Sequence, residues 1–332
     1  MSTLVQKTMT LTRRLLLLAS VTAVTGVGPG RALAQTGTPT TKIVVPFSAG
    51  ALTDIIARIY ADKLTPLLGQ PVIVENRPGA GGVTATAAVA AAPADGHTWL
   101  FVSSAHATNP ALRLKLPYDT EKDFSGLALI ASSPSVLIVN ASHPAKTLQE
   151  FIAAAKRAPG SMSFGSAGIG AATHLAGEYF MAETGTKLLH VPYKGVQEAV
   201  SAVVGGQLDT AFPPIALALQ LIKSGRLRAL AVTSPERVPV MAETPTMAEQ
   251  GFAKYDSSIW YALVMSAAVP KPVMEALAAK VREVSNQPDV IEKLRSQGLI
   301  PKQLMLRDFD KFIAVEIKLI DRLVKASGYK PE

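Results

Sequence analysis

A glycine-rich turn between a strand-like run and an amphipathic helix constrains the fold of this 332-residue chain more than any other stretch. The stretch from Phe164 to Glu178 reads FGSAGIGAATHLAGE and holds four glycines. From about Ala172 its apolar residues recur at helical spacing. Glycine permits positive φ and lets the backbone come close to a ligand. The N–H groups of Gly170 to Thr173, unpaired at the helix start, are therefore predicted to face a bound anion.

Three known phosphate-binding or catalytic motifs fit this turn poorly. Gly165 and Gly170 have the spacing of a P-loop, but no lysine follows them, so a nucleoside triphosphate is disfavoured. Gly168 and Gly170 open a dinucleotide fingerprint in which Thr173 replaces the third glycine. A nucleophile elbow needs a glycine two residues before Ser166, and the chain has none there. A tight turn that binds nothing remains the alternative to a carboxylate site.

The N-terminus has the pattern of a cleaved export signal. Arg13 and Arg14 precede an apolar run of thirteen residues at 15–27, which is too short to span a membrane. An A-x-A ending predicts cleavage after Ala34. The sequence thus predicts a signal peptide at 1–34 and a periplasmic protein. It leaves open whether export uses the general secretory or the twin-arginine route.

Composition narrows the class of protein further. The chain has no cysteine, which excludes disulfides, a thiol nucleophile and a lipid-anchored cysteine, and predicts a soluble periplasmic protein. Removal of the leader leaves 298 residues, enough for two domains, and lowers the formal net charge from +8 to +4. This mild positive charge suits an anionic ligand. Nucleic acid is disfavoured because basic clusters with interleaved aromatics are absent.

The chain after the leader begins with alternating strands and helices. An apolar run at Lys42–Pro46 leads into a turn of small residues at Phe47–Asp54 and then a helix. Strands at Val72–Glu75 and Trp99–Ser103, with an alanine-rich helix at Val83–Ala92 between them, continue the order β-α-β-α-β. This order predicts a parallel sheet with helices on its faces, and ligands bind such sheets at the carboxyl ends of the strands.

Polar residues at these strand ends are candidate ligand groups. Thr53 or Asp54 is predicted to cap the helix after the first turn, and a direct ligand contact is the alternative for Asp54. His106 is interpreted as an exposed loop histidine without a partner. The candidate rim or pocket groups after the third strand are Ser103, Ser104, His106 and Asn109.

A second α/β series follows the first. Its expected elements are the strand Val136–Val139, the helix Thr147–Ala158, the glycine-rich turn, the strand Leu188–Val191, the helix Val196–Val204, the strand Thr210–Phe212, the helix Ile215–Lys223 and the strand Leu227–Val232. A strand at Ser258–Val264 is expected to return to the first domain. The remainder is predicted to be helical at 271–287, 289–297 and in a C-terminal helix.

The sequence shows no pattern typical of a metal site or of nucleophilic catalysis. Its five histidines are scattered, so a zinc or iron site is disfavoured. A catalytic triad could be imagined from Ser166, His174 and Asp209, but their spacing in the sequence does not support one. Nucleophilic catalysis is therefore the weaker interpretation of the glycine-rich turn.

Eight segments resemble one protein family. In chain order they are PFSAGALTD (46–54), GQPVIVENRPGAGG (69–82), PADGHTWLF (93–101), LPYD (116–119), GSAGIGAATHLAGE (165–178), HVPYKG (190–195), LAVTSPER (230–237) and ETPTMAEQG (243–251). Together they resemble the Bug receptors, which are the TctC-like extracytoplasmic solute receptors of tripartite tricarboxylate transporters. The resemblance runs from about Lys42 to the C-terminus.

The resemblance implies the α/β fold of a type II periplasmic binding protein. Two doubly wound α/β domains, 35–135 plus 256–332 and 136–255, would be joined by crossing strands, with a cleft between them that closes on a small carboxylate. In the family, the turn after the first strand and the glycine-rich turn grip one carboxylate, largely through backbone amides and ordered water. The matching positions are Ser48–Thr53 and Ser166–Thr173. The candidate ligand-binding residues are Phe47, Ser48, Ala49, Gly50, Thr53, Asp54, Ser104, Ser166, Ala167, Gly168, Gly170, Ala171, Thr173, His174 and Pro213.

Two departures from the family pattern bear on the ligand. The family usually has two prolines and two glycines in the first turn, whereas this chain has Ser48-Ala49-Gly50-Ala51, whose added Cβ atoms can narrow the site or re-aim an amide. Many members carry an aspartate that suits a ligand ammonium where this chain has Pro213 after Phe212. An amino acid is therefore disfavoured, and a carboxylate with an apolar or neutral far end is predicted.

The sequence therefore predicts a periplasmic solute-binding protein and not an enzyme, with no cofactor and no metal. It would capture a small organic carboxylate for uptake by a tripartite tricarboxylate transporter or for sensing. The expected partners are that carboxylate and membrane transporter subunits or a sensor protein, with no nucleic acid, and a monomer is expected. The alternative is a secreted hydrolase or dinucleotide-dependent enzyme that uses the glycine-rich turn at 165–173. The sequence does not identify the carboxylate, its affinity, or transport versus sensing.

Overall fold

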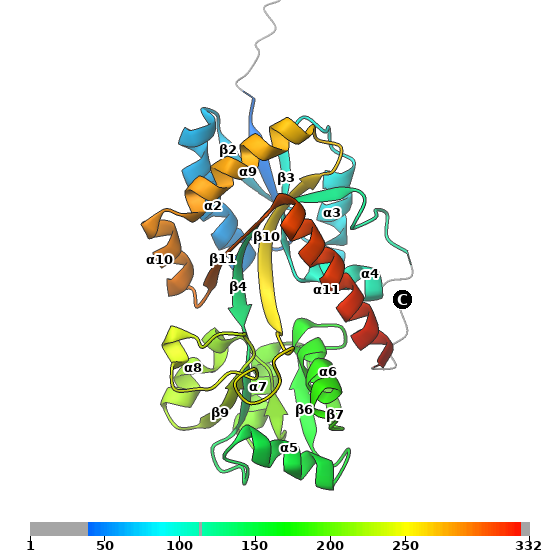
Figure 1. Ribbon diagram of the computed structural model, residues 1–332, viewed down its shortest axis with the longest axis vertical. Coiled ribbons are helices and arrows are strands. Elements are labelled where there is room, and N and C mark those ends of the chain that lie inside the picture. Colours follow the sequence, from blue (N-terminus) through cyan, green and yellow to red (C-terminus); the bar gives the residue numbers. More distant parts are fainter. Residues whose placement is uncertain (1–38, 113–114, 327–332) are drawn as a thin grey trace, which may run out of the picture. The chain divides into compact units, whose positions relative to one another are not determined.

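The computed structural model describes residues 39–112 and 115–326, and the predicted signal peptide with its cleavage site after Ala34 lies outside them. Residues from Thr40 onward form one compact unit. This unit contains two mixed β-sheets with helices packed against them (Figure 1). Along the described chain, no helix combines the length and hydropathy that crossing a bilayer requires.

The first sheet has six strands in the order β11-β4-β10-β3-β1-β2. Strand β1 (Thr41–Val45) pairs in parallel with β2 (Val72–Asn76) and β3 (Thr98–Ser103), as the β-α-β-α-β order predicts. The complete sheet is mixed, because three further strands pair antiparallel. These are β10 (Ser258–Ser266), β4 (Phe124–Pro134) and β11 (Ile300–Met305).

The second sheet has five strands in the order β7-β6-β8-β5-β9. Strand β6 (Ser163–Ser166) pairs in parallel with β7 (Leu189–Pro192) and β8 (Thr210–Ala211). Strand β5 (Val136–Asn140) pairs antiparallel with β8 and with β9 (Leu227–Val232). The carboxyl end of β6 therefore opens into the glycine-rich turn.

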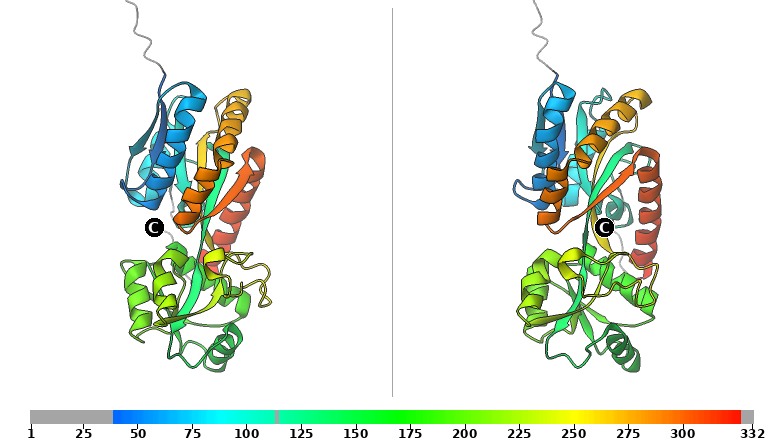
Figure 2. Two further views of the ribbon diagram at one scale, coloured as in Figure 1. Left: turned by 90° about the vertical axis from the view of Figure 1, so that its left-hand side faces the viewer. Right: turned by 60° about the vertical axis from the view of Figure 1, so that its left-hand side comes forward.

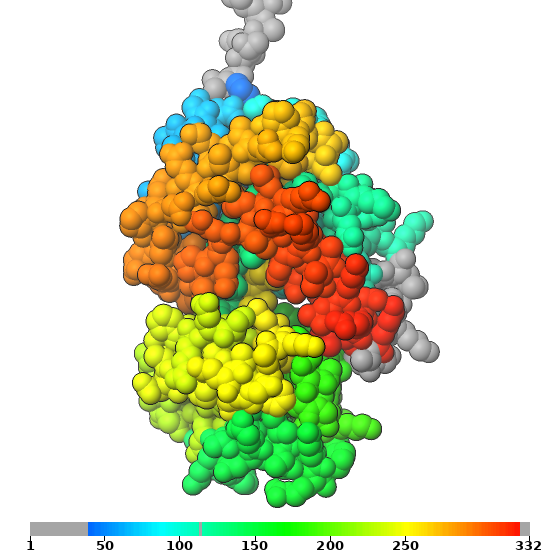
Figure 3. All heavy atoms as spheres, in the orientation of Figure 1, coloured from blue at the N-terminus to red at the C-terminus, as the bar shows by residue number. Residues whose placement is uncertain are grey.

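Ten α-helices are described, most of them where the sequence places them. They are α2 (Leu52–Leu68), α3 (Val83–Ala90), α4 (Ala105–Leu112), α5 (Leu148–Arg157), α6 (Ala172–Thr184), α7 (Val196–Val204), α8 (Ile215–Lys223), α9 (Lys271–Ser285), α10 (Pro288–Ser296) and α11 (Leu306–Ala326). Two short 3-10 turns, η1 (Ala80–Gly82) and η2 (Pro239–Met241), complete the described elements. Figure 3 shows one face of the unit, with α9 and α10 in orange and α11 in red.

Local chemistry explains where these helices begin and end. Thr147 and Glu150 form a capping box at the start of α5, since each side chain accepts a backbone N–H of the other. Helices α2 and α6 end at Gly69 and Gly185, both in the left-handed conformation that glycine adopts without strain. These signals lie within a few residues of chain, which is why the sequence predicts these helices well.

Strands β4 and β5 carry the chain from the first sheet to the second. Strand β4 has eleven residues, and only Ser135 separates it from β5. Ser135 is held on both sides, because its N–H donates to Thr233 Oγ1 (2.8 Å) and its carbonyl accepts the Thr233 N–H (2.9 Å). Strand β10 pairs with β4 along its whole length, and the two run side by side in Figures 1 and 2. This pair matches the crossing strands that the family resemblance implies.

The core is shared between the sheets and the last helix. One buried cluster joins Val102 of β3, Phe164 of β6, Tyr255, Trp260 of β10 and Phe309 of α11. A second fills the opposite face of the first sheet beneath α2 and α9, and a third packs α7 and α8 on the second sheet. Burial of this apolar surface is the main stabilising contribution to the fold. It also fixes the strand ends from which the candidate turns project.

Candidate ligand-binding site

The first candidate turn, between β1 and α2, is held by the carboxylate of Asp54. Its Oδ2 accepts the Gly50 N–H at 2.9 Å and the Arg58 Nε–H at 3.0 Å, and its Oδ1 accepts Asn76 Nδ2–H at 2.9 Å. The prediction that Thr53 or Asp54 caps the helix is wrong, since the cap position is Ala51 and no side chain caps it. Asp54 instead closes the turn back onto Gly50.

The same contacts set the ionisation of Asp54. Burial raises the pKa of this carboxyl, but hydrogen bonds from Arg58, Gly50 and Asn76 outweigh burial and hold the pKa below its ordinary value. Asp54 is therefore ionised at neutral pH, and its charge is matched by Arg58, whose Nη2 lies 3.0 Å from Oδ1. The turn carries no uncompensated charge.

Unpaired donors remain at the start of α2. Helix geometry leaves its first N–H groups without acceptors, and those of Leu52 and Thr53 donate to no group in the described chain. The Thr53 hydroxyl is also unpaired within the described ranges, although Thr53 is only 5% exposed. A buried hydroxyl without a partner costs about 1–3 kcal/mol. This end of α2 therefore presents hydrogen-bond donors that can bind an anionic acceptor.

The second candidate turn, between β6 and α6, is closed by its own side chains. The Ala167 N–H donates to Thr173 Oγ1 (2.9 Å), the Gly168 N–H to Ser166 Oγ (3.0 Å) and the Gly170 N–H to His174 Nδ1 (3.1 Å). The prediction that the Gly170 N–H is unpaired is therefore wrong, because His174 lies one helical turn on and points back at it. The N–H groups of Ala172 and Thr173 do lack an acceptor among the described residues.

A polar cluster supports this turn from beneath. Because His174 Nδ1 accepts a bond, its ring proton lies on Nε2, which is 3.4 Å from Glu178 Oε1. The rings of His174 and His190 lie 4.1 Å apart, and His190 Nε2 lies 2.6 Å from Ser166 Oγ. Burial, with a smaller effect of His174, lowers the pKa of His190 to about 4. His190 is therefore neutral at neutral pH, and its ring packs against that of His174 beneath the turn.

Helix α4 connects the two turns. Near its first residues, His106 and Asn109 line a cavity of about 10 Å³ together with Pro46 and Phe47 of the first turn. At its last residue, Leu112 lies so close to Gly170 that an added Cβ there would be 2.5 Å from Leu112 Cδ1. The sequence did not predict this helix, which brings the candidate turns into one neighbourhood.

The interpretation of His106 as an exposed loop residue is wrong. His106 is 3% exposed and lies in α4, where its ring meets Phe124 edge-on with centroids 5.3 Å apart. Neither ring nitrogen has a hydrogen-bond partner within residues 39–112 and 115–326. Burial accordingly lowers its pKa to about 4. His106 is a packing residue behind the first turn.

The remaining candidates border the same region. Ser104 precedes α4, donates its N–H to the Trp260 carbonyl at 3.0 Å and is partly exposed. Pro213 is buried at the end of β8 and its carbonyl accepts the Val136 N–H at 2.9 Å. Strand β5 therefore starts against Pro213. Both residues stay candidates for ligand contact.

The side chains of the second turn do not form a nucleophilic triad. Ser166 is fully buried and contacts His190, whereas Asp209 accepts the N–H and hydroxyl of Ser163 at 2.7 and 2.9 Å. The imagined partner His174 faces Gly170 and Glu178. Within the described chain, no cluster of three or more acidic or histidine side chains could hold a metal ion. A larger hollow of about 760 Å³ lies away from both turns, between α9 and α11.

The fold and these turns define a periplasmic binding protein, and the comparisons name its family. Residues 56–329 match the family described as the tripartite tricarboxylate transporter family receptor, TctC. The chain is 38% identical over 257 residues to a UPF0065 protein of Pseudomonas sp. strain P51, covering 77% of this chain and 76% of that one. It is 34% identical to BugT of Bordetella pertussis over 87% of this chain and 89% of that protein. The chain belongs to the Bug or TctC receptor family.

Solved structures agree with this assignment. An R. palustris protein solved with adipate is 28% identical and covers 90% of this chain and 100% of its own, with a TM-score of 0.72. MatC from Rhodopseudomonas palustris, solved with malate, is 29% identical and covers 86% and 98%, with a TM-score of 0.66. Receptors of this family are periplasmic, bind small solutes and serve transporters. The chain is thus a solute-binding receptor and not an enzyme, and these relatives lend no support to a hydrolase.

Proposed function

We propose that this receptor binds a carboxylate group of a small organic acid between the starts of α2 and α6. The observation that carries the proposal is the buried hydroxyl of Thr53, which has no hydrogen-bond partner among the described residues and lies next to N–H groups at the start of α2 that also have none there. A ligand carboxylate supplies the acceptor that these donors lack. The N–H groups of Ala172 and Thr173 supply matching donors on the second turn.

Backbone donors are sufficient to bind such a group. A helix start carries a partial positive charge and accepts an anion without a basic side chain. Hydrogen bonds to a charged acceptor are about twice as strong as neutral ones, and exclusion of water strengthens them further. Arg58, the cation near the first turn, is already paired with Asp54. The ligand is therefore held mainly by N–H groups and by the Thr53 hydroxyl.

The far end of the ligand is proposed to be apolar or neutral. Malate and adipate, the ligands of two solved relatives, are dicarboxylates, so they support a carboxylate ligand, whereas the neutral far end rests on this chain's own residues. In this chain the Cβ atoms of Ala49 and Ala51 narrow the first turn. Pro213 has no negative charge that could bind the ammonium group of an amino acid. An amino acid is therefore a poor ligand. The other residues proposed to line the site are Phe47, Ser48, Gly50, Asp54, Ser104, Ser166, Ala167, Gly168, Gly170, Ala171 and His174.

The proposed setting is a mature periplasmic monomer that starts after Ala34. Its two domains, 35–135 plus 256–332 and 136–255, close on the ligand about the crossing strands. The closed form is offered to membrane subunits of the transporter or to a sensor protein. The receptor family supports this setting, because its members serve tripartite tricarboxylate transporters.

A ligand screen with a matched variant tests the proposal. The purified chain is titrated calorimetrically with malate, adipate, citrate, nicotinate, glutamate, NAD and ATP, and the best ligand is repeated with Thr53→Val. Valine keeps the shape of threonine but removes the hydroxyl. Loss of a hydrogen bond to a charged group weakens binding by about 1.5–3 kcal/mol, which is roughly 10- to 100-fold. The unliganded variant should be at least as stable as the parent, because an unpaired hydroxyl disappears.

Two results contradict the proposal. Binding of NAD or ATP with no binding of any carboxylate means that the glycine-rich turn holds a phosphate. Unchanged carboxylate affinity in Thr53→Val means that the ligand does not reach the start of α2.

A further inference from the structure

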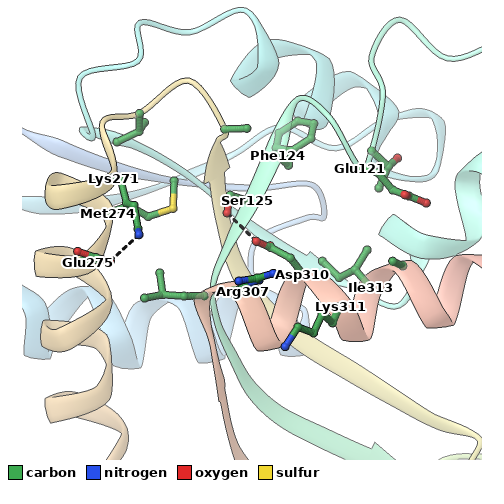
Figure 4. A pocket seen from close by; sticks show the side chains of 15 residues that line it. Glu121, Phe124, Ser125, Lys271, Met274, Glu275, Arg307, Asp310, Lys311 and Ile313 are labelled. Carbon is green, nitrogen blue, oxygen red and sulfur yellow. Dashed lines mark hydrogen bonds and ion pairs between the residues drawn. The ribbon is translucent and has the colours of Figure 1, made fainter.

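A hollow between α9 and α11 is separate from the two candidate turns. Its volume is about 760 Å³, within the range of about 300–1,000 Å³ that small-molecule sites occupy. Figure 4 shows Lys271, Met274 and Glu275 of α9 on one side and α11 on the other, with Phe124 and Ser125 of β4 between them. None of the residues proposed to bind the carboxylate lines it.

The floor of the hollow is apolar. Phe124, Val269, Met274 and Ile313 line it with side chains that are at most 8% exposed, and Leu306 joins them at the start of α11. Apolar surface of this kind takes an apolar body, because its contact with water is unfavourable. A wholly polar ligand would gain little here.

Most charges around the hollow are already paired within the protein. Lys271 Nζ lies 3.6 Å from Glu275 Oε1 on the exposed rim, and Lys311 Nζ lies 2.9 Å from Asp308 Oδ1. Both oxygens of Asp310 accept bonds from β4, from the Ser125 hydroxyl at 2.9 Å and the Gly126 N–H at 2.6 Å. These groups hold the walls together and leave few charges for a ligand.

Arg307 is the exception among the cations lining the hollow, since within the described chain this exposed residue makes no ion pair or hydrogen bond, and its charge helps only to lower the pKa of the adjacent Asp308. Two lining carboxylates, Glu121 and Asp310, also have no ion pair in the described residues; both oxygens of Asp310 accept hydrogen bonds, and Figure 4 shows Glu121 well apart from Arg307. Leu306, just before Arg307, has φ of 49°. A left-handed leucine costs about 1–2 kcal/mol, and such strain concentrates at binding sites. It fixes where α11 begins and so where Arg307 enters the hollow.

We propose that this hollow is a second binding site, which takes an amphipathic organic anion. The apolar body lies on Phe124, Met274, Leu306 and Ile313, and the anionic head pairs with the Arg307 guanidinium. A planar guanidinium binds a carboxylate or sulfonate through two parallel hydrogen bonds. This site differs from the carboxylate site proposed between the turns, where Arg58 is paired with Asp54 and binding is proposed through backbone N–H groups.

Octanoate is the test ligand, and its binding to the purified chain is measured by calorimetry. Acetate is the control that has the carboxylate without the apolar chain. The alcohol 1-octanol is the control that has the apolar chain without the carboxylate. Arg307→Gln removes the positive charge. Ala314 also lines the hollow, so Ala314→Trp fills it. Lys318→Gln is the matched control, because Lys318 is an exposed cation of the same helix that does not line the hollow.

The proposal predicts that octanoate binds at least tenfold more tightly than acetate or 1-octanol. Arg307→Gln and Ala314→Trp each weaken octanoate binding at least tenfold, whereas Lys318→Gln changes it less than twofold. Thr53→Val leaves octanoate binding at this site intact, so failure here is distinct from failure at the turns. Octanoate affinity that is unchanged in both Arg307→Gln and Ala314→Trp, or 1-octanol binding equal to octanoate binding, overturns the site.

Discussion

Replacing Gly170 by alanine tests whether the glycine-rich turn packs against α4. Gly170 has φ of +77°, and a Cβ added there lies 2.5 Å from Leu112 Cδ1 and 3.1 Å from Leu112 Cδ2. Contacting carbon atoms normally lie about 3.5–4.0 Å apart, so Leu112 must move by about 1 Å. The alanine must also adopt the left-handed conformation, which costs about 1–2 kcal/mol.

Gly225→Ala is the matched control for the backbone cost. Gly225 has φ of +72°, and nothing lies within 4 Å of an added Cβ. This variant should lower the free energy of unfolding by about 1–2 kcal/mol through backbone strain alone. Gly170→Ala should lower it by about 1 kcal/mol more, at the low end of overpacking costs, because the Leu112 atoms that must move end a partly buried, flexible side chain. The difference between the two variants isolates the contact with α4.

Urea denaturation followed by circular dichroism measures both effects, with the slope checked for a change in the transition. Calorimetry on the best carboxylate should show at least a tenfold loss of affinity in Gly170→Ala and none in Gly225→Ala. Leu112→Ala, combined with Gly170→Ala in a double-mutant cycle, should recover the excess loss of stability. Equal destabilisation by the two glycine variants refutes the packing of Leu112 on the turn.

Two further predictions concern buried ionisable groups. Burial lowers the pKa of His106 to about 4 in the folded chain. As the pH decreases from about 6.5 to about 4, the unfolded chain therefore binds a proton before the folded chain does, and the free energy of unfolding decreases. His106→Phe should remove up to about 3 kcal/mol of this loss of stability, as measured by urea denaturation at pH 7 and pH 4.5. A pH dependence of stability that is the same in the variant as in the parent would contradict this prediction. Hydrogen bonds lower the pKa of Asp54 despite its burial, so its contribution is full at neutral pH and is lost as pH falls below the ordinary carboxyl range. Asp54→Ala should lower the free energy of unfolding at pH 7 by about 1.5–3 kcal/mol and by less at pH 3; an equal loss at both values shows that the charge of Asp54 plays no part.

Helices and strands whose ends are marked by nearby residues could be predicted from the sequence, whereas those that depend on contacts with distant segments could not. Helices α7 and α8 and strand β9 begin and end where their apolar runs do. Strand β4 was missed because it is buried on both faces, so its side chains show no alternation. Helix α4 was missed because Pro110 lies inside it and its short polar sequence has no apolar stripe. Strand β11 was missed because Pro301 and an irregular register interrupt it.

The candidate site could likewise be predicted only in part from the sequence. Glycines and small residues after a strand predict the two turns, since positive φ at Gly50, Gly168 and Gly170 is a local requirement. Which N–H groups stay unpaired depends on side-chain direction, as when His174 turns back to accept the Gly170 N–H. The burial of His106 against Phe124 depends on contacts between distant segments. Neither is visible in a pattern of residue types.

The most direct test of the account is a crystal structure of the chain with the carboxylate that binds best. The account predicts that one carboxylate group accepts hydrogen bonds from Thr53, through its hydroxyl or N–H, and from the N–H groups of Ala172 or Thr173. A carboxylate that contacts neither helix start, or that lies only between α9 and α11, would contradict it.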